Sequence, residues 1–483
     1  MKTRIVSALR TGICGLFWLL PVPHSVAQTW VQLFPTGTPP ATRGWHGTSG
    51  VYDAANQRMI IFAGRSAPLI DPLNDVWVLS HANGLGGQPQ WLNLIANGAP
   101  GSPPFRAGHS AVYDSANNRM MIFGGCRSVC LPTLNDLWVL TSANGLGGTP
   151  TWSQLSPTGS PPAPRVQHAA VYDPSSNRMV IFAGQSGGGS PVGTFDDVWI
   201  LTHANGLGGT PEWIELTVTG GPPEGQYGPT AVYDPASNRM IVFGGWESNA
   251  VWALTNANGL GGPSEWINLI AEDAVGAPPP RGWGSAVYDP ALNRMTIFGG
   301  GGSLSDVWTL FDANGVSAVP SWKQRLPVGD ESPAARCCHA AILDANSGRM
   351  TIFGGSHTSN FNDVWVLTGG ILGDLDELIA ATVARITSAD PPGANGMIGK
   401  LTGGGGVAVR VTHAVLSFAA GEIDPAAYAM ELLDALDKLD AFEHQVEAKI
   451  NNGQIGEPEA PEIVELTVQI RDLIELLLIN APL

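Results

Sequence analysis

Arginine and histidine recur together in one short pattern along the first three quarters of this chain. Four copies read Arg-x-x-His, a fifth keeps only the arginine, and a sixth has glutamine instead. The residues are Arg43 and His46, Arg106 and His109, Arg165 and His168, Arg336 and His339, Arg281, and Gln226. A guanidinium binds carboxylates, phosphates and hydroxyls through a planar fork of donors, and neutral imidazole is a common metal ligand. The chemistry open to this set is anion or hydroxyl binding, or metal coordination.

Four aromatic residues stand near the same segments, namely Trp45, Tyr227, Trp246 and Trp283. Exposed tryptophan and tyrosine rings offer flat surfaces on which sugars or side chains stack. Ordinary apolar packing is the alternative. With the arginines, the histidines and Gln226, these rings complete the candidate ligand-binding set.

A repeated unit must position these residues. Residues 111–125 run through an apolar segment, a turn, a second apolar segment and two glycines. Copies lie at 170–184, 231–245 and 286–300, with looser ones at 50–64 and 341–355. A third run containing tryptophan and a fourth short run follow, joined in most copies by an Asn-Gly-Leu-Gly-Gly turn. Each unit is predicted to be a four-stranded antiparallel sheet that buries its faces against the next unit.

The paired glycines and the third-strand tryptophans resemble kelch repeats over about residues 29–368. The resemblance implies an all-β, six-bladed kelch β-propeller over residues 28–370. The first strand along the chain, 30–33, matches the fourth strand of the repeated unit, and the last, 363–367, matches the third strand. We therefore expect the N-terminal strand to complete the last blade, which removes an exposed sheet edge.

In such a propeller, the arginine segments and the loops between second and third strands share one face. These loops differ between copies, and a variable surface is the better candidate for a site. In kelch proteins that bind peptides or acidic motifs, arginines of this segment contact the ligand, so the resemblance implies that role here. The alternative is that these side chains only bridge neighbouring blades. The histidines would surround a channel mouth wider than a coordination sphere, so no metal site or other cofactor is expected.

Galactose oxidase-like copper enzymes also carry a kelch propeller, and their site implies two tyrosines, two histidines and a cysteine. Here only Tyr227 stands near the channel mouth outside the repeat, because five other tyrosines belong to the repeated unit and Tyr428 to the tail. The sequence therefore predicts a non-catalytic protein, with a copper oxidoreductase as the alternative.

Four cysteines follow the N-terminal segment. Cys126 and Cys130 share one loop, and export would make a local disulfide between them the expected state. Cys337 and Cys338 are adjacent, so their Cα atoms lie about 3.8 Å apart, below the usual disulfide span. A strained vicinal disulfide and two thiols are the alternatives for this pair.

The two ends of the chain differ from its middle. Residues 1–27 combine basic residues, a short apolar run and a small-x-small motif, and this pattern predicts a secretory signal peptide of bacterial style. The apolar run is too short for a membrane anchor. Residues 371–483 show helical periodicity and predict a small, acidic, all-α domain, with Asp424 and Pro425 beginning a helix. Within it, residues 439–455 resemble the FIMAH domain of secreted bacterial proteins.

The net charge of −17 and the lack of a basic stripe argue against nucleic-acid binding. Together these observations predict an exported, non-catalytic propeller, either extracellular or periplasmic, that recognises a polysaccharide or a protein through its variable face. A structural component of a cell surface or matrix is the remaining alternative.

Overall fold

The computed structural model describes residues 28–455 with gaps, and a few positions beyond them. The gaps are 45–48, 67–71, 128–130, 188–192, 222, 224, 302–303, 328–330, 369–378, 380–381, 384–397, 399, 403–405 and 420–423. After residue 455, only 463–464, 467, 470–471 and 474 are described. The expected signal peptide at 1–27 lies outside the described residues. The chain divides into two compact units, one of which holds residues 30–345 and 349–367.

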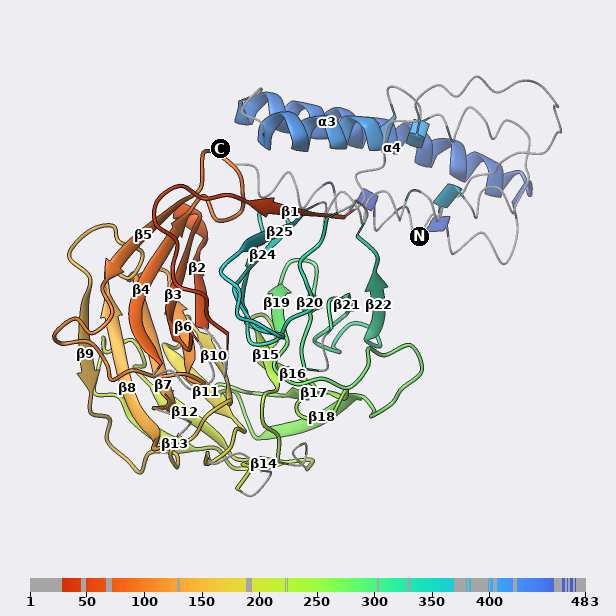
Figure 1. The fold of residues 1–483 in the computed structure, drawn as a ribbon. Coiled ribbons are helices and arrows are strands. Elements are labelled where there is room, and N and C mark those ends of the chain that lie inside the picture. The colour runs from red at the N-terminus through yellow and green to blue at the C-terminus, as the bar shows by residue number, and fades with distance from the viewer. Residues whose placement is uncertain are drawn as a thin grey trace. The chain divides into compact units, whose positions relative to one another are not determined.

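Six sheets form this unit, arranged around a central axis (Figure 1), and their strands pair antiparallel except for one short parallel edge strand, β14. In chain order the first three are β2 (Ser49–Asp53), β3 (Arg58–Gly64), β4 (Leu73–Ser80) and β5 (Gln90–Ile95); β6 (Ser110–Asp114), β7 (Arg119–Cys126), β8 (Thr133–Thr141) and β9 (Thr151–Leu155); and β10 (Ala169–Asp173), β11 (Arg178–Phe182), β12 (Val198–Thr202) and β13 (Glu212–Glu215). The other three are β15 (Thr230–Asp234), β16 (Arg239–Phe243), β17 (Val251–Leu254) and β18 (Ser264–Ile270), with β14 (Val218–Thr219) at the edge; β19 (Ser285–Asp289), β20 (Arg294–Phe298), β21 (Val307–Phe311) and β22 (Ser321–Arg325); and β23 (Ala340–Asp344), β24 (Arg349–Phe353), β25 (Val364–Thr368) and β1 (Thr29–Leu33). The predicted six-bladed β-propeller is confirmed.

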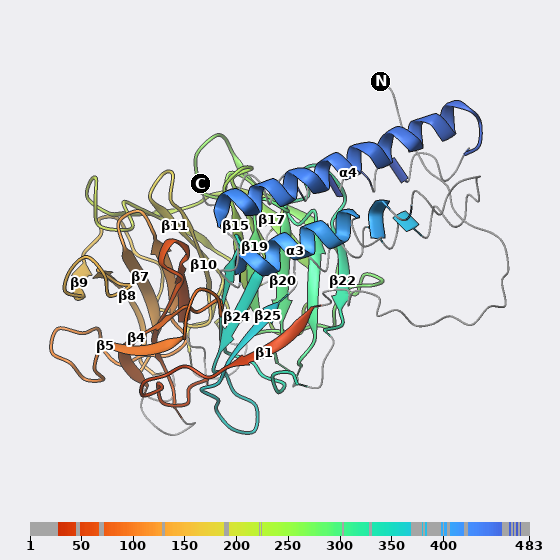
Figure 2. The ribbon, with the colours of Figure 1, turned by 90° about the horizontal axis from the view of Figure 1, so that it is seen from above.

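The ring closes as the strand types predict. β1 hydrogen-bonds to β25 and supplies the outer strand of blade six, and both ribbon views place the two strands side by side (Figure 1 and Figure 2). The first strands of neighbouring blades lie next to each other all the way round, from β2 through β6, β10, β15, β19 and β23 back to β2. Residues from the two ends of the propeller thus share one sheet.

The repeated aromatic residues join each blade to the next. The fourth-strand tryptophan of one blade packs on the second-strand phenylalanine of the preceding blade, with ring centroids 4.7–5.0 Å apart in all six junctions. In the junction between blades two and three, Phe123 contacts Trp213. Both side chains are buried. Because each ring covers apolar surface that its own blade cannot cover, packing of one blade on the next stabilises the fold.

Polar contacts also join the blades at the face that carries the first hairpin turns and the Asn-Gly turns. The Asp and Arg that flank the first hairpin turn hold the asparagine of the next blade's Asn-Gly turn. For example, Asn205 Nδ2 donates to Asp114 Oδ2 at 2.6 Å, and Arg119 Nη1 donates to the carbonyl of Asn205 at 2.9 Å. The same two contacts occur at four other junctions. These repeated residues therefore have a structural role.

The C-terminal unit contains α3 (Val407–Ala419) and α4 (Pro425–Asn451), which pack against each other. As predicted, Asp424 caps α4, since its carboxylate accepts a hydrogen bond from the Ala427 N–H at 2.8 Å. Leu432, Leu439 and Val446 form the buried face of the helix. Much of the rest of the all-α domain predicted at 371–483 falls outside the described residues, and the FIMAH resemblance stays a prediction.

Candidate functional site

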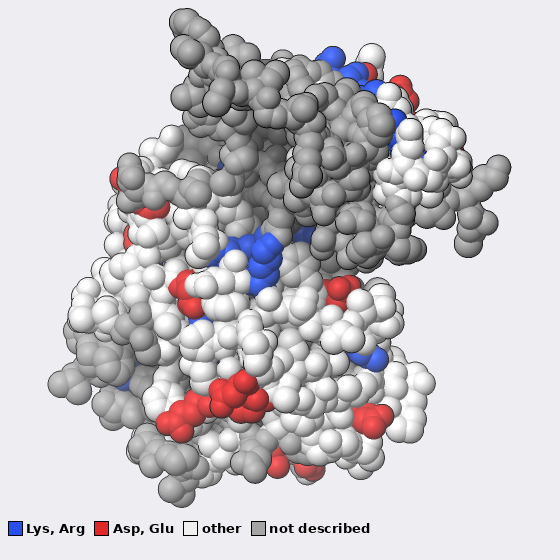
Figure 3. All heavy atoms as spheres, turned by 90° about the vertical axis from the view of Figure 1, so that its right-hand side faces the viewer, with Lys and Arg blue, Asp and Glu red and all other residues white. Residues whose placement is uncertain are grey.

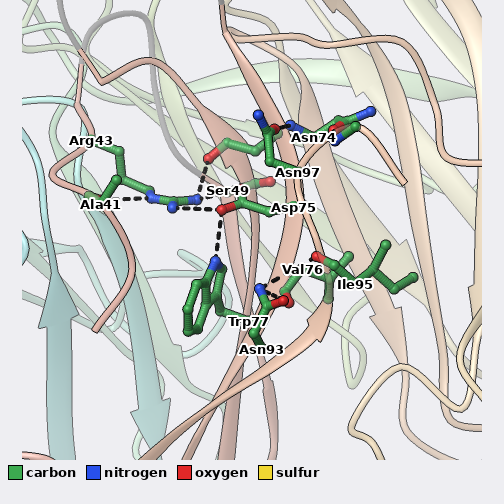
Figure 4. Close-up of polar contacts among 12 residues, drawn as sticks. Ala41, Arg43, Ser49, Asn74, Asp75, Val76, Trp77, Asn93, Ile95 and Asn97 are labelled. Atoms are coloured by element: carbon green, nitrogen blue, oxygen red, sulfur yellow. Dashed lines mark hydrogen bonds and ion pairs between the residues drawn. The ribbon is translucent and has the colours of Figure 1, made fainter. Parts of the chain in front are cut away.

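The five arginines of the repeated segment are buried. Arg43, Arg106 and Arg165 have no exposed surface, and Arg281 and Arg336 are 3% and 1% exposed. Each guanidinium makes a two-point ion pair with the aspartate that stands two residues before the third-strand tryptophan. The pairs are Arg43–Asp75, Arg106–Asp136, Arg165–Asp197, Arg281–Asp306 and Arg336–Asp363. Figure 4 shows the first of them, with Asp75 also accepting from Trp77.

The pair in blade three shows how fully these donors are used. Arg165 Nη1 and Nη2 lie 2.6 and 2.7 Å from the two oxygens of Asp197, and Nη1 also donates to the Ala183 carbonyl. Burial acts to raise the pKa of Asp197, but hydrogen bonds and charge from Arg165, with the Trp199 N–H, hold it below the ordinary value. The predicted ligand-binding role is therefore wrong for these arginines. The bridging alternative also fails for their side chains, because both partners belong to one blade.

Blade four lacks this pair entirely. Gln226 stands at the arginine position and Ala250 at the aspartate position. The Gln226 carbonyl accepts a hydrogen bond from the Gly184 N–H at 2.8 Å, so its backbone keeps the contact that this segment makes with the preceding blade. Both members of the ion pair are thus replaced together in the only blade of the six without it.

The histidines join neighbouring blades. His109, His168 and His339 are buried, and Nε2 of each hydrogen-bonds to a serine on the first strand of the preceding blade, respectively Ser49 at 2.5 Å, Ser110 at 2.8 Å and Ser285 at 2.6 Å. Burial, aided by the nearby arginine, lowers the pKa of His168 and of His339 to about 3, and it lowers that of His109 well below its usual value. These three are neutral bridging groups, so their assignment to a ligand site is wrong. His46 and Trp45 lie outside the described residues.

A line of backbone hydrogen bonds connects the blades just before the innermost strands. The N–H groups of Gln167, Gly228, Trp283 and Cys338 donate to the carbonyls of Gly108, Gln167, Gly228 and Trp283 at 2.8–2.9 Å. We call these five residues the inner rim. All have positive φ, between 56° and 70°. This is the left-handed region that favours glycine, yet three rim positions carry side chains.

Three aromatic rings from the candidate set come together at blades four and five. Tyr227 stacks on Trp246 with centroids 5.7 Å apart and planes 20° from parallel, and Trp283 meets both rings edge-on or tilted. We call these three residues the aromatic cradle. Trp246 is 44% exposed, and Tyr227 and Trp283 are half-buried. Burial and the charge of Glu247 raise the pKa of Tyr227, so its hydroxyl stays protonated at neutral pH.

The predictions for the two cysteine pairs have different outcomes. The Sγ atoms of Cys337 and Cys338 are 3.1 Å apart, with the Cys338 thiol donating to Cys337. This is a hydrogen-bond contact, so the vicinal disulfide is not formed in this structure. Cys126 is buried, but Cys130 lies outside the described residues. The disulfide between them stays a prediction.

Comparison with known proteins places the propeller in a family. The KLHDC2/KLHL20/DRC7 Kelch-repeats domain matches residues 16–146 and 147–259, about half of the chain. The chain belongs to the Kelch-repeat family. Kelch relatives include dynein regulatory complex subunit 7 of Chlamydomonas reinhardtii, 31% identical over 30% of this chain and 11% of that protein. Another is the leucine-zipper-like transcriptional regulator 1 homolog of Drosophila melanogaster, 29% identical over 59% of this chain and 27% of that protein.

This Kelch chain therefore spans well under half the length of these curated relatives. Two solved structures are also similar. YjhT gives a TM-score of 0.47 at 15% identity over 70% of this chain and 97% of that one. A fungal alcohol oxidase of the AA5 family in complex with copper gives 0.41 at 13% identity, over 70% and 75%. Both relatives named above are eukaryotic, and the bacterial origin expected from the leader stays a prediction.

Within the described part of this Kelch protein, no group of three or more His, Cys, Asp and Glu side chains is placed to hold one metal ion. The described helices include none that is both long and apolar enough to cross a bilayer. On the face seen in Figure 3, the described basic and acidic side chains form small separate groups.

Proposed function

We propose that this protein is a non-catalytic Kelch scaffold that binds a protein partner at the aromatic cradle. The observation that carries the proposal is the exposed cradle itself, which lies where blade four has lost its buried Arg–Asp pair. Kelch propellers serve as protein-interaction scaffolds, and one relative is by name a subunit of a regulatory complex. Binding of a polysaccharide through the same rings is the competing form of this proposal.

The surroundings of the cradle favour a basic side chain as the group it binds. Glu247 is exposed beside Trp246, and its charge acts on Tyr227. An arginine or lysine can lie over the face of an indole while it pairs with a carboxylate. The five repeat arginines cannot oppose such a guest electrostatically at close range, because each is neutralised by its own aspartate.

We predict that Trp246→Ala weakens binding of a basic peptide about 10- to 30-fold, which is about 1.4–2 kcal/mol. Stability should change by less than about 0.5 kcal/mol, because much of the ring is already in water. Full-length labelled protein would be screened on an array of short arginine- and lysine-containing peptides and on neutral polysaccharides. Leu146→Ala is the matched control, since Leu146 is 39% exposed in a turn at the opposite face.

Peptide signals that require a basic residue and disappear in Trp246→Ala would support the protein-scaffold proposal. Signals confined to polysaccharides, and lost in the same variant, would replace it with carbohydrate recognition. Binding that Trp246→Ala leaves intact would show that the cradle is not the site.

Export remains part of the proposal and rests on the leader-like pattern of residues 1–27. Expression of the whole chain in a bacterial host with a secretion pathway should yield protein in the medium or periplasm that begins at Gln28, which N-terminal sequencing would show. Protein retained in the cytoplasm with residues 1–27 intact would contradict export.

A further inference from the structure

Two adjacent thiols lie at the inner rim in blade six, where Cys338 is a rim residue and Cys337 directly precedes it. Cys337 and Cys338 are both half-buried, and their Sγ atoms are 3.1 Å apart. In blade two the same two positions hold Ala107 and Gly108, and the side chain of Ala107 is fully buried. The Cys337 side chain is thus more accessible than its counterpart.

The backbone fixes the two thiols in this arrangement. The N–H and carbonyl of Cys337 each bond to Ser356, both at 3.0 Å, and the N–H of Cys338 donates to the Trp283 carbonyl at 2.9 Å. Cys338 has φ of +62°, a conformation that the inner rim imposes on every residue at this position. The two sulfur atoms are therefore held in contact with each other.

The surroundings also favour the thiolate of Cys337. The hydrogen bond from the Cys338 thiol is the largest cause, and the Ser356 hydroxyl, 3.8 Å away, and a backbone contact add to it against the opposing effect of burial. The pKa of Cys337 is about 7. Half of this thiol is then ionised at neutral pH, and the thiolate is the nucleophilic form.

We propose that Cys337 and Cys338 form a thiol–disulfide exchange site for small disulfides, with Cys337 as the attacking thiol and Cys338 as the resolving thiol. The Cys337 thiolate attacks one sulfur of a disulfide RSSR, the S–S bond breaks, and RS⁻ leaves. Cys338 then loses its proton to solvent, its sulfur attacks Cys337 Sγ, and the second RS⁻ leaves. Two protein thiols are oxidised to one disulfide, and RSSR is reduced to two thiols.

The strained geometry of a disulfide between Cys337 and Cys338 would make it easy to reduce back to two thiols. A disulfide between neighbours must span Cα atoms about 3.8 Å apart, whereas ordinary disulfides span 4.4–6.8 Å. Such strain makes the bond easier to reduce, as in labile and regulatory disulfides. The site does not depend on ligand binding at the aromatic cradle, so the two proposals are tested separately.

The test compares reduced full-length protein with two variants that copy blade two, Cys337→Ala and Cys338→Gly. Each protein is incubated with oxidised glutathione at pH 7, quenched, alkylated and digested, and the peptide carrying both positions is followed by mass spectrometry. Wild type should pass through a single glutathione adduct to an internal disulfide. Cys338→Gly should accumulate the adduct on Cys337. Cys337→Ala should react roughly fivefold more slowly than wild type. The Cys337 thiol, with a pKa near 7, is more ionised than an ordinary thiol but intrinsically less nucleophilic as a thiolate, and the first effect is the larger.

Tryptophan fluorescence in denaturant would first establish that both variants fold. A persistent glutathione adduct in wild type, with no internal disulfide, would overturn the resolving role of Cys338. Equal rates for wild type and Cys337→Ala would overturn the attacking role of Cys337.

Discussion

Replacing Arg165 by glutamine is expected to destabilise the propeller by about 3–5 kcal/mol, the cost of breaking a buried ion pair by removing one partner. The guanidinium has no exposed surface, and its loss leaves the Asp197 carboxylate, 22% exposed, without its two-point partner. Loss of the cation lying 4.3 Å from the Phe195 ring adds to the effect. Urea unfolding of the chain from Gln28 onward, followed by tryptophan fluorescence, reports this unit selectively, because every tryptophan after Gln28 lies between Trp30 and Trp365.

Blade four supplies the matched control. The double variant Arg165→Gln/Asp197→Ala recreates its natural combination of Gln226 and Ala250. We expect it to be more stable than Arg165→Gln by about 1 kcal/mol or more, because the unpaired carboxylate is gone. If Arg165→Gln and Asp197→Ala each lower the free energy of unfolding and their losses simply add in the double variant, the two side chains are not coupled as an ion pair.

Acid is expected to weaken the propeller from about pH 6.5 downward, which begins above the range in which carboxylates titrate. His109, His168 and His339 are neutral when folded, with pKa values lowered to about 3 for two of them, but near 6.5 when unfolded. As pH falls from about 6.5, these histidines therefore bind protons in the unfolded chain but not in the folded chain. Each histidine removes about 1.4 kcal/mol of unfolding free energy per pH unit between pH 6 and 4.

One histidine can be isolated from the other two. His168→Gln keeps a polar side chain facing Ser110 but cannot titrate, so the slope of unfolding free energy against pH should fall by about 1.4 kcal/mol per unit. Ser110→Ala removes the hydrogen bond but keeps the imidazole, so it should lower stability at every pH and preserve the slope. An unchanged slope in His168→Gln would mean that this imidazole does not titrate on unfolding.

The architecture could be predicted because one pattern is written six times. The recurrence of Val-Tyr-Asp before the turn and of Asp-x-Trp in most third strands indicates both the sheet type and the number of blades. The type of the first and last strands was enough to predict that β1 joins β25. No comparable repetition exists in the C-terminal unit, where only the capped start of helix α4 could be placed from the sequence.

The role of the arginines was not predictable from their type, because a guanidinium suits a buried carboxylate as well as a ligand. A signal was nevertheless present. Aspartate stands two residues before the third-strand tryptophan in five blades and is missing in blade four, the blade without arginine. Likewise, serine begins the first strand of each blade that precedes a described histidine. Ala169 and Thr230 begin the first strands of blades three and four, and the blades that follow them lack the histidine. Substitution in pairs across repeats indicated contact inside the molecule.

Tyr227, Trp246 and Trp283 were expected on one face with Trp45, but their meeting in one aromatic cradle could not be predicted. The structure shows that Trp283 occupies a position of the inner rim, with a side chain where Gly108 and Gly228 have none. Glycine and tryptophan look unrelated in sequence, and only the shared positive φ connects them.

The pairing of β1 with β25 also governs the order in which the chain can mature. Blades one to five consist of strands that are close in sequence, so each can form soon after it emerges from the ribosome. Blade six cannot, because β1 must wait until residue 368 has been made. During that interval Trp30 lacks its partner Phe298, and an apolar strand edge stays open to other chains. A nascent protein of this kind would benefit from a chaperone or from delayed folding until synthesis is complete.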